Sequence, residues 1–81
     1  MKDLIELMDD YMCEKTDFIL ATEFYREQYS YYVIKEKKQY WIITYANRED
    51  VYITLSINDE FIKEADIRTI EELEEFIKEI Y

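Results

Sequence analysis

The sequence predicts an α+β fold in which a four-stranded antiparallel meander is flanked by an N-terminal and a C-terminal helix (α-β-β-β-β-α), with both helices on one face. Three observations predict it. Both ends of the chain have amphipathic helical spacing, residues 17–57 are rich in β-branched and aromatic side chains, and the connections between them are short and polar. No proline, glycine or low-complexity tract divides the 81 residues, so we expect one domain over residues 1–81.

The opening segment, residues 2–15, predicts the first helix. Its apolar side chains recur at helical spacing and its acids fall on the other side. The apolar set is Leu4, Leu7, Met8, Tyr11 and Met12, and the acidic set is Asp3, Glu6, Asp9, Asp10 and Glu14.

The middle of the chain predicts four strands, near residues 17–25, 29–35, 39–45 and 51–57. The last of them, VYITLSI, alternates apolar with polar or aromatic residues, as a strand with one buried face does. The connections REQ, EK and ANRED predict hairpins. Residues 58–66 fit either a short helical turn or the lead-in to the last helix.

The closing segment predicts a helix over residues 69–81, with Thr69 and Glu72 as a capping box. Its apolar side is formed by Ile70, Leu73, Phe76, Ile77 and Ile80. Such a helix is roughly 18 Å long, at ~1.5 Å per residue. About five phosphates of one nucleic-acid strand fit in that length at ~3.4 Å each, and the helix carries Glu71, Glu72, Glu74, Glu75 and Glu79. Lys78 is expected to pair with Glu74.

Three assumed strand pairs decide which face of the sheet each residue takes. Pairing Tyr45 with Val51, Lys35 with Lys38, and Tyr25 with Tyr29 gives two faces. The inner face then holds Phe18, Leu20, Thr22, Phe24, Tyr32, Ile34, Trp41, Ile43, Val51, Ile53, Leu55 and Ile57. The outer face holds Tyr25, Tyr29, Tyr31, Val33, Tyr40, Ile42, Thr44 and Tyr52, together with Ile19, Ala21 and Glu23.

The outer face therefore gathers Tyr25, Tyr29, Tyr31, Tyr40 and Tyr52. Three interpretations stay open. Tyrosine has a high strand propensity and covers many solvated sheets. It also supplies large contact area at interfaces, which fits a partner-binding patch. Thirdly, two such faces can pack together in a homodimer.

The formal net charge is -10, and it lies at the two ends of the chain. Residues 1–17 carry six acids and two bases, residues 18–58 carry five of each, and residues 59–81 carry nine acids and three bases. Direct binding to nucleic acid or to anionic membranes is disfavoured, and a basic protein surface is the favoured partner. The candidate contacts are Asp9, Asp10, Glu71, Glu72, Glu74, Glu75 and Glu79. A solvated helix face that confers solubility is the alternative interpretation.

The chain lacks most of the side chains that catalysis uses. With no histidine, no glycine and one cysteine, it has no means to form common zinc sites, His-dependent nucleophiles or phosphate-binding loops. The remaining candidates are neighbouring carboxylates such as Asp9 and Asp10, whose side chains point apart on a helix. We therefore expect no enzyme activity, no catalytic or metal-binding residues and no cofactor. Cys13 follows the apolar side of the first helix and is expected to be a core or boundary residue.

The acidic N-terminus and the shortness of the apolar runs predict a cytoplasmic protein. In size, acidity and α/β character the chain resembles the small inhibitors that phages make against host defence enzymes, including anti-CRISPR proteins and DNA mimics. The leading hypothesis is an inhibitor that occupies the basic surface of a nucleic-acid-handling enzyme. The alternatives are an immunity or antitoxin protein that neutralises a basic toxin, and a homodimeric structural or regulatory module that uses the tyrosine face.

Overall fold

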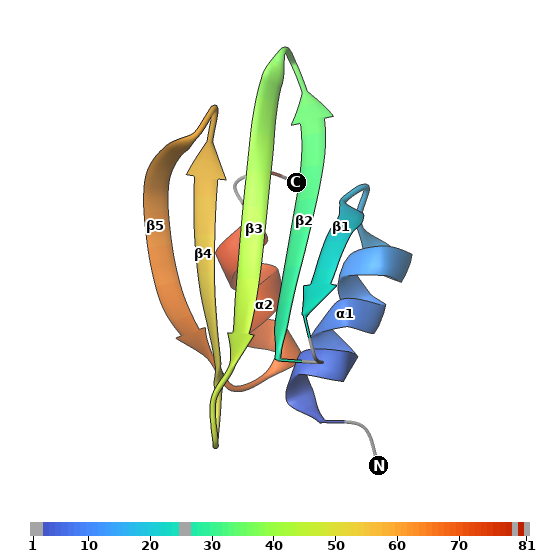
Figure 1. The fold of residues 1–81 in the computed structure, drawn as a ribbon, viewed down its shortest axis with the longest axis vertical. Coiled ribbons are helices and arrows are strands. Elements are labelled where there is room, and N and C mark those ends of the chain that lie inside the picture. Colours follow the sequence, from blue (N-terminus) through green and yellow to red (C-terminus); the bar gives the residue numbers. More distant parts are fainter. Residues whose placement is uncertain (1–2, 25–26, 79, 81) are drawn as a thin grey trace.

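The protein folds as one antiparallel sheet with two helices (Figure 1). The computed structural model describes residues 3–24, 27–78 and 80. The elements in chain order are α1 (Leu4–Lys15), β1 (Ile19–Phe24), β2 (Gln28–Lys35), β3 (Lys38–Ala46), β4 (Val51–Ile57), β5 (Glu60–Ile67) and α2 (Ile70–Ile77). The strands follow one another across the sheet in the order β1-β2-β3-β4-β5. The predicted α+β class and the meander are confirmed, but the sheet has five strands and not four.

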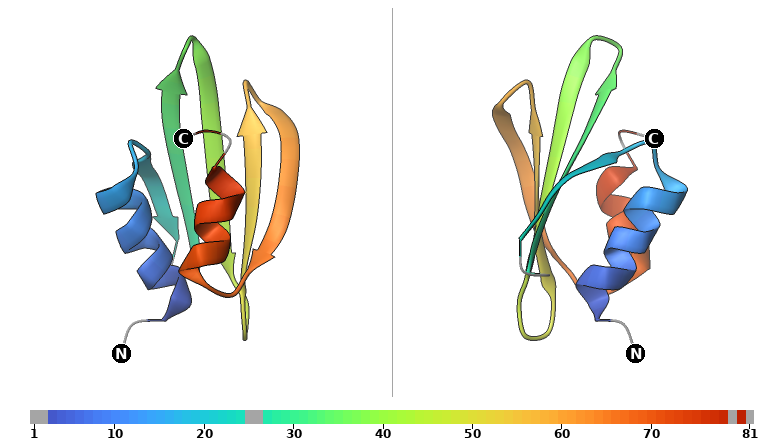
Figure 2. Two further views of the ribbon diagram at one scale, coloured as in Figure 1. Left: turned by 180° about the vertical axis from the view of Figure 1, so that it is seen from behind. Right: turned by 45° about the vertical axis from the view of Figure 1, so that its right-hand side comes forward.

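Both helices lie on the same face of the sheet, as predicted. The view from behind places α1 and α2 in front of the strands, and the side view leaves the opposite face without any covering element (Figure 2). Since α1 precedes the meander and α2 follows it, the chain enters and leaves the sheet on one side. The sheet therefore has a covered face and an open face.

The fifth strand is formed by residues that the sequence left ambiguous. Asn58 and Asp59 both have positive φ, at 51° and 67°, and make a two-residue turn between β4 and β5. Asparagine and aspartate tolerate this left-handed conformation better than other non-glycine residues. The Asn58 side chain also accepts a hydrogen bond from the Gln39 backbone N–H at 2.9 Å, which ties the turn to β3. The chain thus reverses here and continues as β5.

The predicted pairing of β3 with β4 is wrong by one residue. Val51 pairs with Ala46, and Tyr45 pairs with Tyr52. The Asn47 N–H donates to the Asp50 carbonyl at 2.9 Å, and the Asn47 side-chain amide donates to the Asp50 carboxylate at 3.0 Å. These two bonds close a four-residue connection, which leaves Ala46 inside the strand.

This single shift exchanges the faces of β2 and β3, because the β2–β3 pairing of Lys35 with Lys38 is as predicted. Tyr29 and Tyr31 were predicted on the outer face, but they are buried under the helices, and Tyr40 packs partly buried against the same core. Tyr52 lies on the open face, as predicted, and Tyr25 lies outside the described residues. Buried with the two tyrosines are Val33, Ile42 and Thr44, while Tyr32, Ile34, Trp41, Ile43 and Tyr45 take the open face.

The predicted pairing of Tyr25 with Tyr29 is also wrong, since Tyr29 pairs with Glu23. The β1 register shifts between Leu20 and Thr22, so that Ala21 is an extra residue in β1. Phe18 is buried as predicted, but Thr22 pairs with Ser30 on the open side and not the core side.

The core lies between the sheet and the helices. α1 contributes Ile5, Met8 and Met12, and β4 contributes Val51, Ile53 and Leu55. Leu7 was predicted on the buried side of α1 but is 44% exposed. At the end of α1 the Thr16 hydroxyl donates to the Met12 carbonyl and accepts from the Phe18 N–H at 3.2 Å, which turns the chain into β1.

The C-terminal helix has the predicted start but is shorter than predicted. The Glu72 N–H donates to the Thr69 hydroxyl at 3.2 Å, so the cap is confirmed. The helix ends at Ile77 and not near residue 81, which shortens it to about 12 Å at ~1.5 Å per residue. Five glutamates in a row of phosphate pitch do not fit on a helix of this length.

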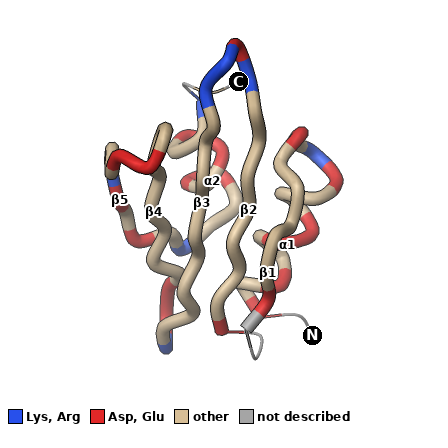
Figure 3. Tube along the Cα trace, turned by 45° about the horizontal axis from the view of Figure 1, so that its top comes forward, with Lys and Arg blue, Asp and Glu red and all other residues tan. Residues whose placement is uncertain are grey.

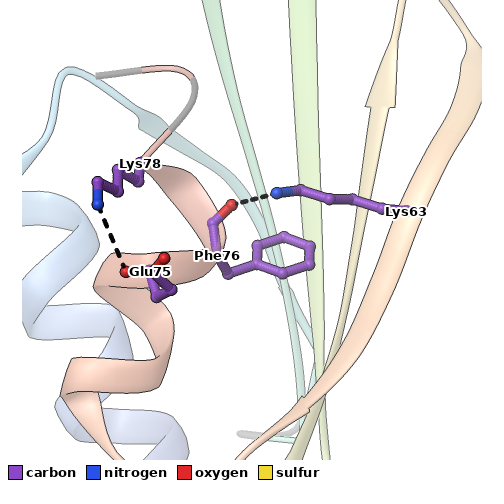
Figure 4. A network of polar contacts seen from close by, with 4 residues as sticks. All are labelled: Lys63, Glu75, Phe76 and Lys78. Atoms are coloured by element: carbon purple, nitrogen blue, oxygen red, sulfur yellow. Dashed lines mark hydrogen bonds and ion pairs between the residues drawn. The ribbon is translucent and has the colours of Figure 1, made fainter.

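Lysines from the sheet hold the C-terminal end of α2, whose last turn has no basic residue of its own. The Lys63 ammonium, from β5, donates to the Phe76 carbonyl at 2.6 Å and lies 4.5 Å from the centre of the Phe76 ring (Figure 4). The Lys35 ammonium, from β2, donates to the Ile80 carbonyl at 3.1 Å. A cation at a helix C-terminus interacts favourably with the helix dipole, so Lys63 stabilises the docked helix, whereas Lys35 bonds to the segment that follows α2.

Among the described residues, no helix has the length and apolar character needed to cross a membrane.

Candidate interaction surfaces

Acidic residues are frequent along both helices, and further acidic residues lie on β5 and at the turn before it (Figure 3). A groove of about 570 Å³ runs between the two helices. α1 and the residue after it contribute Tyr11, Lys15 and Thr16, and α2 and its end contribute Glu71, Glu74, Glu75, Ile77 and Lys78. We call this the interhelical groove. It exists because both helices pack on the same sheet face through their apolar sides.

Tyr11 and Glu74 both line the interhelical groove. Burial raises the pKa of Tyr11, and the negative charge of Glu74 raises it further. Tyr11 thus keeps its proton and can donate a hydrogen bond. The carboxylates of Glu71 and Glu74 are exposed and form no ion pair among the described residues, whereas Glu75 lies 3.9 Å from the Lys78 ammonium. The structure therefore pairs Lys78 with Glu75 instead of the predicted Glu74.

The other predicted acidic contacts have different environments. Asp9 accepts a hydrogen bond from the buried Tyr31 hydroxyl at 2.6 Å, so it stabilises the fold. Glu72 accepts from the Arg68 N–H at 3.1 Å and belongs to the cap of α2. Asp10 is half-buried on α1, and Glu79 lies outside the described residues. Of the seven predicted acids, the structure brings Glu71, Glu74 and Glu75 together in one groove.

The open face of the sheet carries the molecule's second surface, and it is aromatic and aliphatic. One row crosses all five strands in register: Ile19, Tyr32, Trp41, Ser56 and Phe61. The rings of Tyr32 and Trp41 lie 5.4 Å apart, and in a second row the rings of Tyr45 and Tyr52 lie 5.8 Å apart. Ile34 lies beyond the first row and is 67% exposed. We call these side chains, with Ile43, the open-face patch.

Charge is confined to one edge of this face. The open-face residues of β1, β2, β3 and β4 are uncharged. The open-face residues of β5 include Glu64 and Asp66. The Tyr52 hydroxyl donates to the Glu64 carboxylate, and this hydrogen bond is the main cause that raises the pKa of Tyr52. The open-face patch is therefore neutral over four strands.

Ile19, Tyr52 and Ser56 lie on the face predicted for them, and Phe61 lies in the segment that the sequence left ambiguous. The other members of the patch were predicted in the core, because the pairing of Tyr45 with Val51 was assumed. The signal that identifies the correct register is the pair Asn47 and Asp50, which bond to each other and close the connection before Val51.

Cys13 was predicted in the core or at its boundary, but it is exposed on α1. Partial burial raises the pKa of its thiol, and the neighbouring carboxylates, Asp9 first, raise it further. A raised pKa lowers the thiolate fraction and the reactivity of the thiol. Among the residues that the structure describes, no three histidine, cysteine, aspartate or glutamate side chains gather to hold a metal ion.

Comparison with known proteins finds no matching family model and no significant match to a curated protein or a solved structure.

Proposed function

We propose that this chain is a small, non-catalytic binding protein that inhibits a nucleic-acid-handling enzyme by docking its helical side on the enzyme's basic surface. The observation that carries the proposal is the convergence of Glu71, Glu74 and Glu75 with the Tyr11 hydroxyl on one interhelical groove. A surface built to bind phosphates presents arginine and lysine side chains, and carboxylates bind the same groups through charge-assisted hydrogen bonds.

The lining of the interhelical groove favours arginine over lysine as the inserted side chain. Lys15 and Lys78 also line the groove, so a partner's cation competes with two ammonium groups for the carboxylates. Arginine forms two parallel hydrogen bonds to a carboxylate, a geometry that lysine does not provide. Its guanidinium also stacks on an aromatic ring such as that of Tyr11. An arginine-rich surface is therefore the partner that the groove fits best.

The net charge of -10 adds long-range attraction to this contact. Such a field accelerates encounter with a basic surface and weakens as salt is added. The short α2 presents its acids at a groove rather than in an extended phosphate-like row, so the proposed mimicry of DNA is one of charge and not of spacing. A phage inhibitor of a host defence nuclease and an antitoxin against a basic toxin both fit this chemistry.

The first test uses deca-arginine as the probe and titration calorimetry as the measurement. The variant Glu71→Gln/Glu74→Gln removes two groove carboxylates. The variant Glu36→Gln/Glu49→Gln removes two exposed carboxylates elsewhere and has the same net charge, so it is the matched control. We expect the groove variant to bind about tenfold more weakly, which corresponds to about 1.4 kcal/mol, and the control to stay within about twofold. Equal losses in the two variants contradict a groove contact.

The partner is then identified by affinity capture from the native host, with the wild type and both variants in parallel. We expect a nucleic-acid-handling enzyme to be retained by the wild type and by the control variant, lost with the groove variant, and inhibited when the wild type is added to its assay. A captured protein that the groove variant retains equally, or whose activity is unchanged, contradicts the proposal. A toxin that is retained by the wild type and the control variant, and lost with the groove variant, favours an antitoxin function.

A further inference from the structure

The two edges of the sheet are protected against pairing with another strand. In β1 the register shifts at Ala21, and in β5 it shifts between Lys63 and Phe61, which leaves Ile62 as an extra residue. Such bulges bend an edge strand and interrupt its hydrogen-bonding ladder. Lys63 adds a charged side chain directed inward from the β5 edge, a second device that natural sheets use against edge pairing.

The open face carries no described charged side chain over β1, β2, β3 and β4, and its acids lie at the β5 edge. In the row that crosses the five strands, Ile19 is 55% exposed and Phe61 is 57% exposed, with the half-buried Tyr32 and Trp41 between them. Aromatic and aliphatic side chains in one contiguous patch are typical of a protein interface, because their exposure to water is unfavourable. Figure 1 looks onto this face, which no helix or loop of the described residues crosses. The open-face patch therefore differs from an ordinary solvated sheet face.

The distribution of charge indicates what covers the open-face patch. A basic partner gains little from residues that are uncharged over β1, β2, β3 and β4. Two copies of this chain, each with a net charge of -10, repel each other through their helical sides. Contact between open faces is the arrangement that points the acidic helices of the two copies in opposite directions. It also puts the same patch on both sides, as a two-fold dimer requires.

The area of the open face fits an interface with a second copy of the chain. Five strands at ~4.8 Å spacing and about seven residues at ~3.3 Å each give a flat area of roughly 550 Å². The accessible area of projecting side chains exceeds the flat area, so the face approaches the ~800 Å² that each partner buries in a standard interface. Two sheets then pack about 10 Å apart with their side chains interdigitated, as in a β-sandwich.

We infer that two copies of the chain form a homodimer in which the open-face patch of one packs against that of the other. This inference is independent of the proposed basic partner. The dimer leaves both interhelical grooves exposed on its two outer sides.

Sedimentation equilibrium over a concentration series that reaches the high micromolar range tests the dimer. The wild type should reach twice its 10.1 kDa mass. Trp41→Lys places a charge at the centre of the patch and should stay at 10.1 kDa. Leu7→Lys makes the same kind of change at an exposed apolar position on α1, outside the patch, and should dimerise as the wild type does. A wild type that stays monomeric, assemblies larger than two, or equal behaviour of the two variants overturns the inference.

A second variant keeps the test decisive if Trp41→Lys unfolds, which circular dichroism detects. Ile19→Lys/Phe61→Lys changes two side chains that are each more than half exposed, so the monomer should keep its fold while the charges repel across the interface. Salt separates this inference from the proposed function. Added salt should leave the dimer unchanged or stronger, because it screens the repulsion between acidic chains, whereas binding to deca-arginine should weaken.

Discussion

The hydrogen bond from Tyr31 to Asp9 shows how one buried residue decides the role of a surface acid. Tyr31 is fully buried beneath α1, and its hydroxyl has to find a partner there. Asp9 supplies that partner at 2.6 Å from the inner side of α1. The carboxylate therefore stabilises the packing of α1 on β2. Its place in an acidic sequence gave no indication of this role, which depends on a residue 22 positions away.

The variant Tyr31→Phe tests this contact through pH. Burial, then the hydrogen bond to Asp9 and its negative charge, raises the pKa of Tyr31 above its ordinary value of 10.0. Above pH 10 the unfolded chain loses this proton and the folded chain keeps it. The free energy of unfolding should therefore fall by about 1.4 kcal/mol per pH unit more in the wild type than in the variant. Urea unfolding from neutral pH to about pH 11 measures the difference.

At neutral pH the same variant should be less stable than the wild type by about 1–2 kcal/mol, because Asp9 loses a hydrogen bond. The two stabilities should approach each other above pH 10. Tyr32→Phe, which removes a hydroxyl on the open face, should change the free energy of unfolding at neutral pH by less than about 0.5 kcal/mol. Parallel curves for the wild type and Tyr31→Phe over the whole range contradict the assigned role.

At the scale of elements, the tight turns explain why the pairing of β2 with β3 was predicted correctly and that of β3 with β4 was not. The turn of Glu36 and Lys37 was placed correctly, since two residues join two apolar runs and the pairing of Lys35 with Lys38 follows. The connection before β4 was read one residue too long, so the pattern of apolar residues was carried to the wrong face. Both faces of β3 hold large side chains, and periodicity alone therefore does not choose between them.

The fifth strand was missed for a related reason. In residues 58–66 the charged side chains outnumber the apolar ones, because β5 is an edge strand and most of its side chains are exposed. Its one strong signal was the adjacent pair Asn58 and Asp59, a common turn pair that does not include the usual glycine. The helix cap at Thr69, which depends on local contacts, was predicted correctly.

The turn between β2 and β3 provides a test of backbone strain. Glu36 and Lys37 have φ of 53° and 68°, a left-handed conformation that disfavours residues with a Cβ. Replacing the pair by Asn–Gly should raise the free energy of unfolding by about 1–2 kcal/mol in urea titrations. Glu49→Gly, at a position without positive φ, should instead lower it by about 0.4–1 kcal/mol, because glycine raises the conformational entropy of the unfolded chain. A loss of stability in the Asn–Gly variant contradicts the turn geometry.

At the scale of the whole molecule, the aromatic surface lies opposite the acidic helices and carries acids at its β5 edge alone among the described residues. Composition and the distribution of acids along the chain predicted the acidic helical side, because both helices lie at the ends of the chain and pack on one face. An aromatic sheet face was predicted, and Tyr52 lies on it as predicted, but its residues on β2 and β3 were predicted wrongly because they depend on the β3–β4 register. This separation is the basis of both proposals, a basic partner docked on the helices and a second copy docked on the sheet.

Tryptophan fluorescence on dilution tests this separation most directly, because Trp41 is the one tryptophan and lies on the open face. Trp41 should be accessible to acrylamide in dilute protein. As the concentration rises and a second copy covers it, its quenching should fall and its emission should shift to shorter wavelength. A tryptophan that is protected at every concentration would show that Trp41 belongs to the core. A tryptophan that stays accessible at every concentration would show that no second copy of the chain covers the open face.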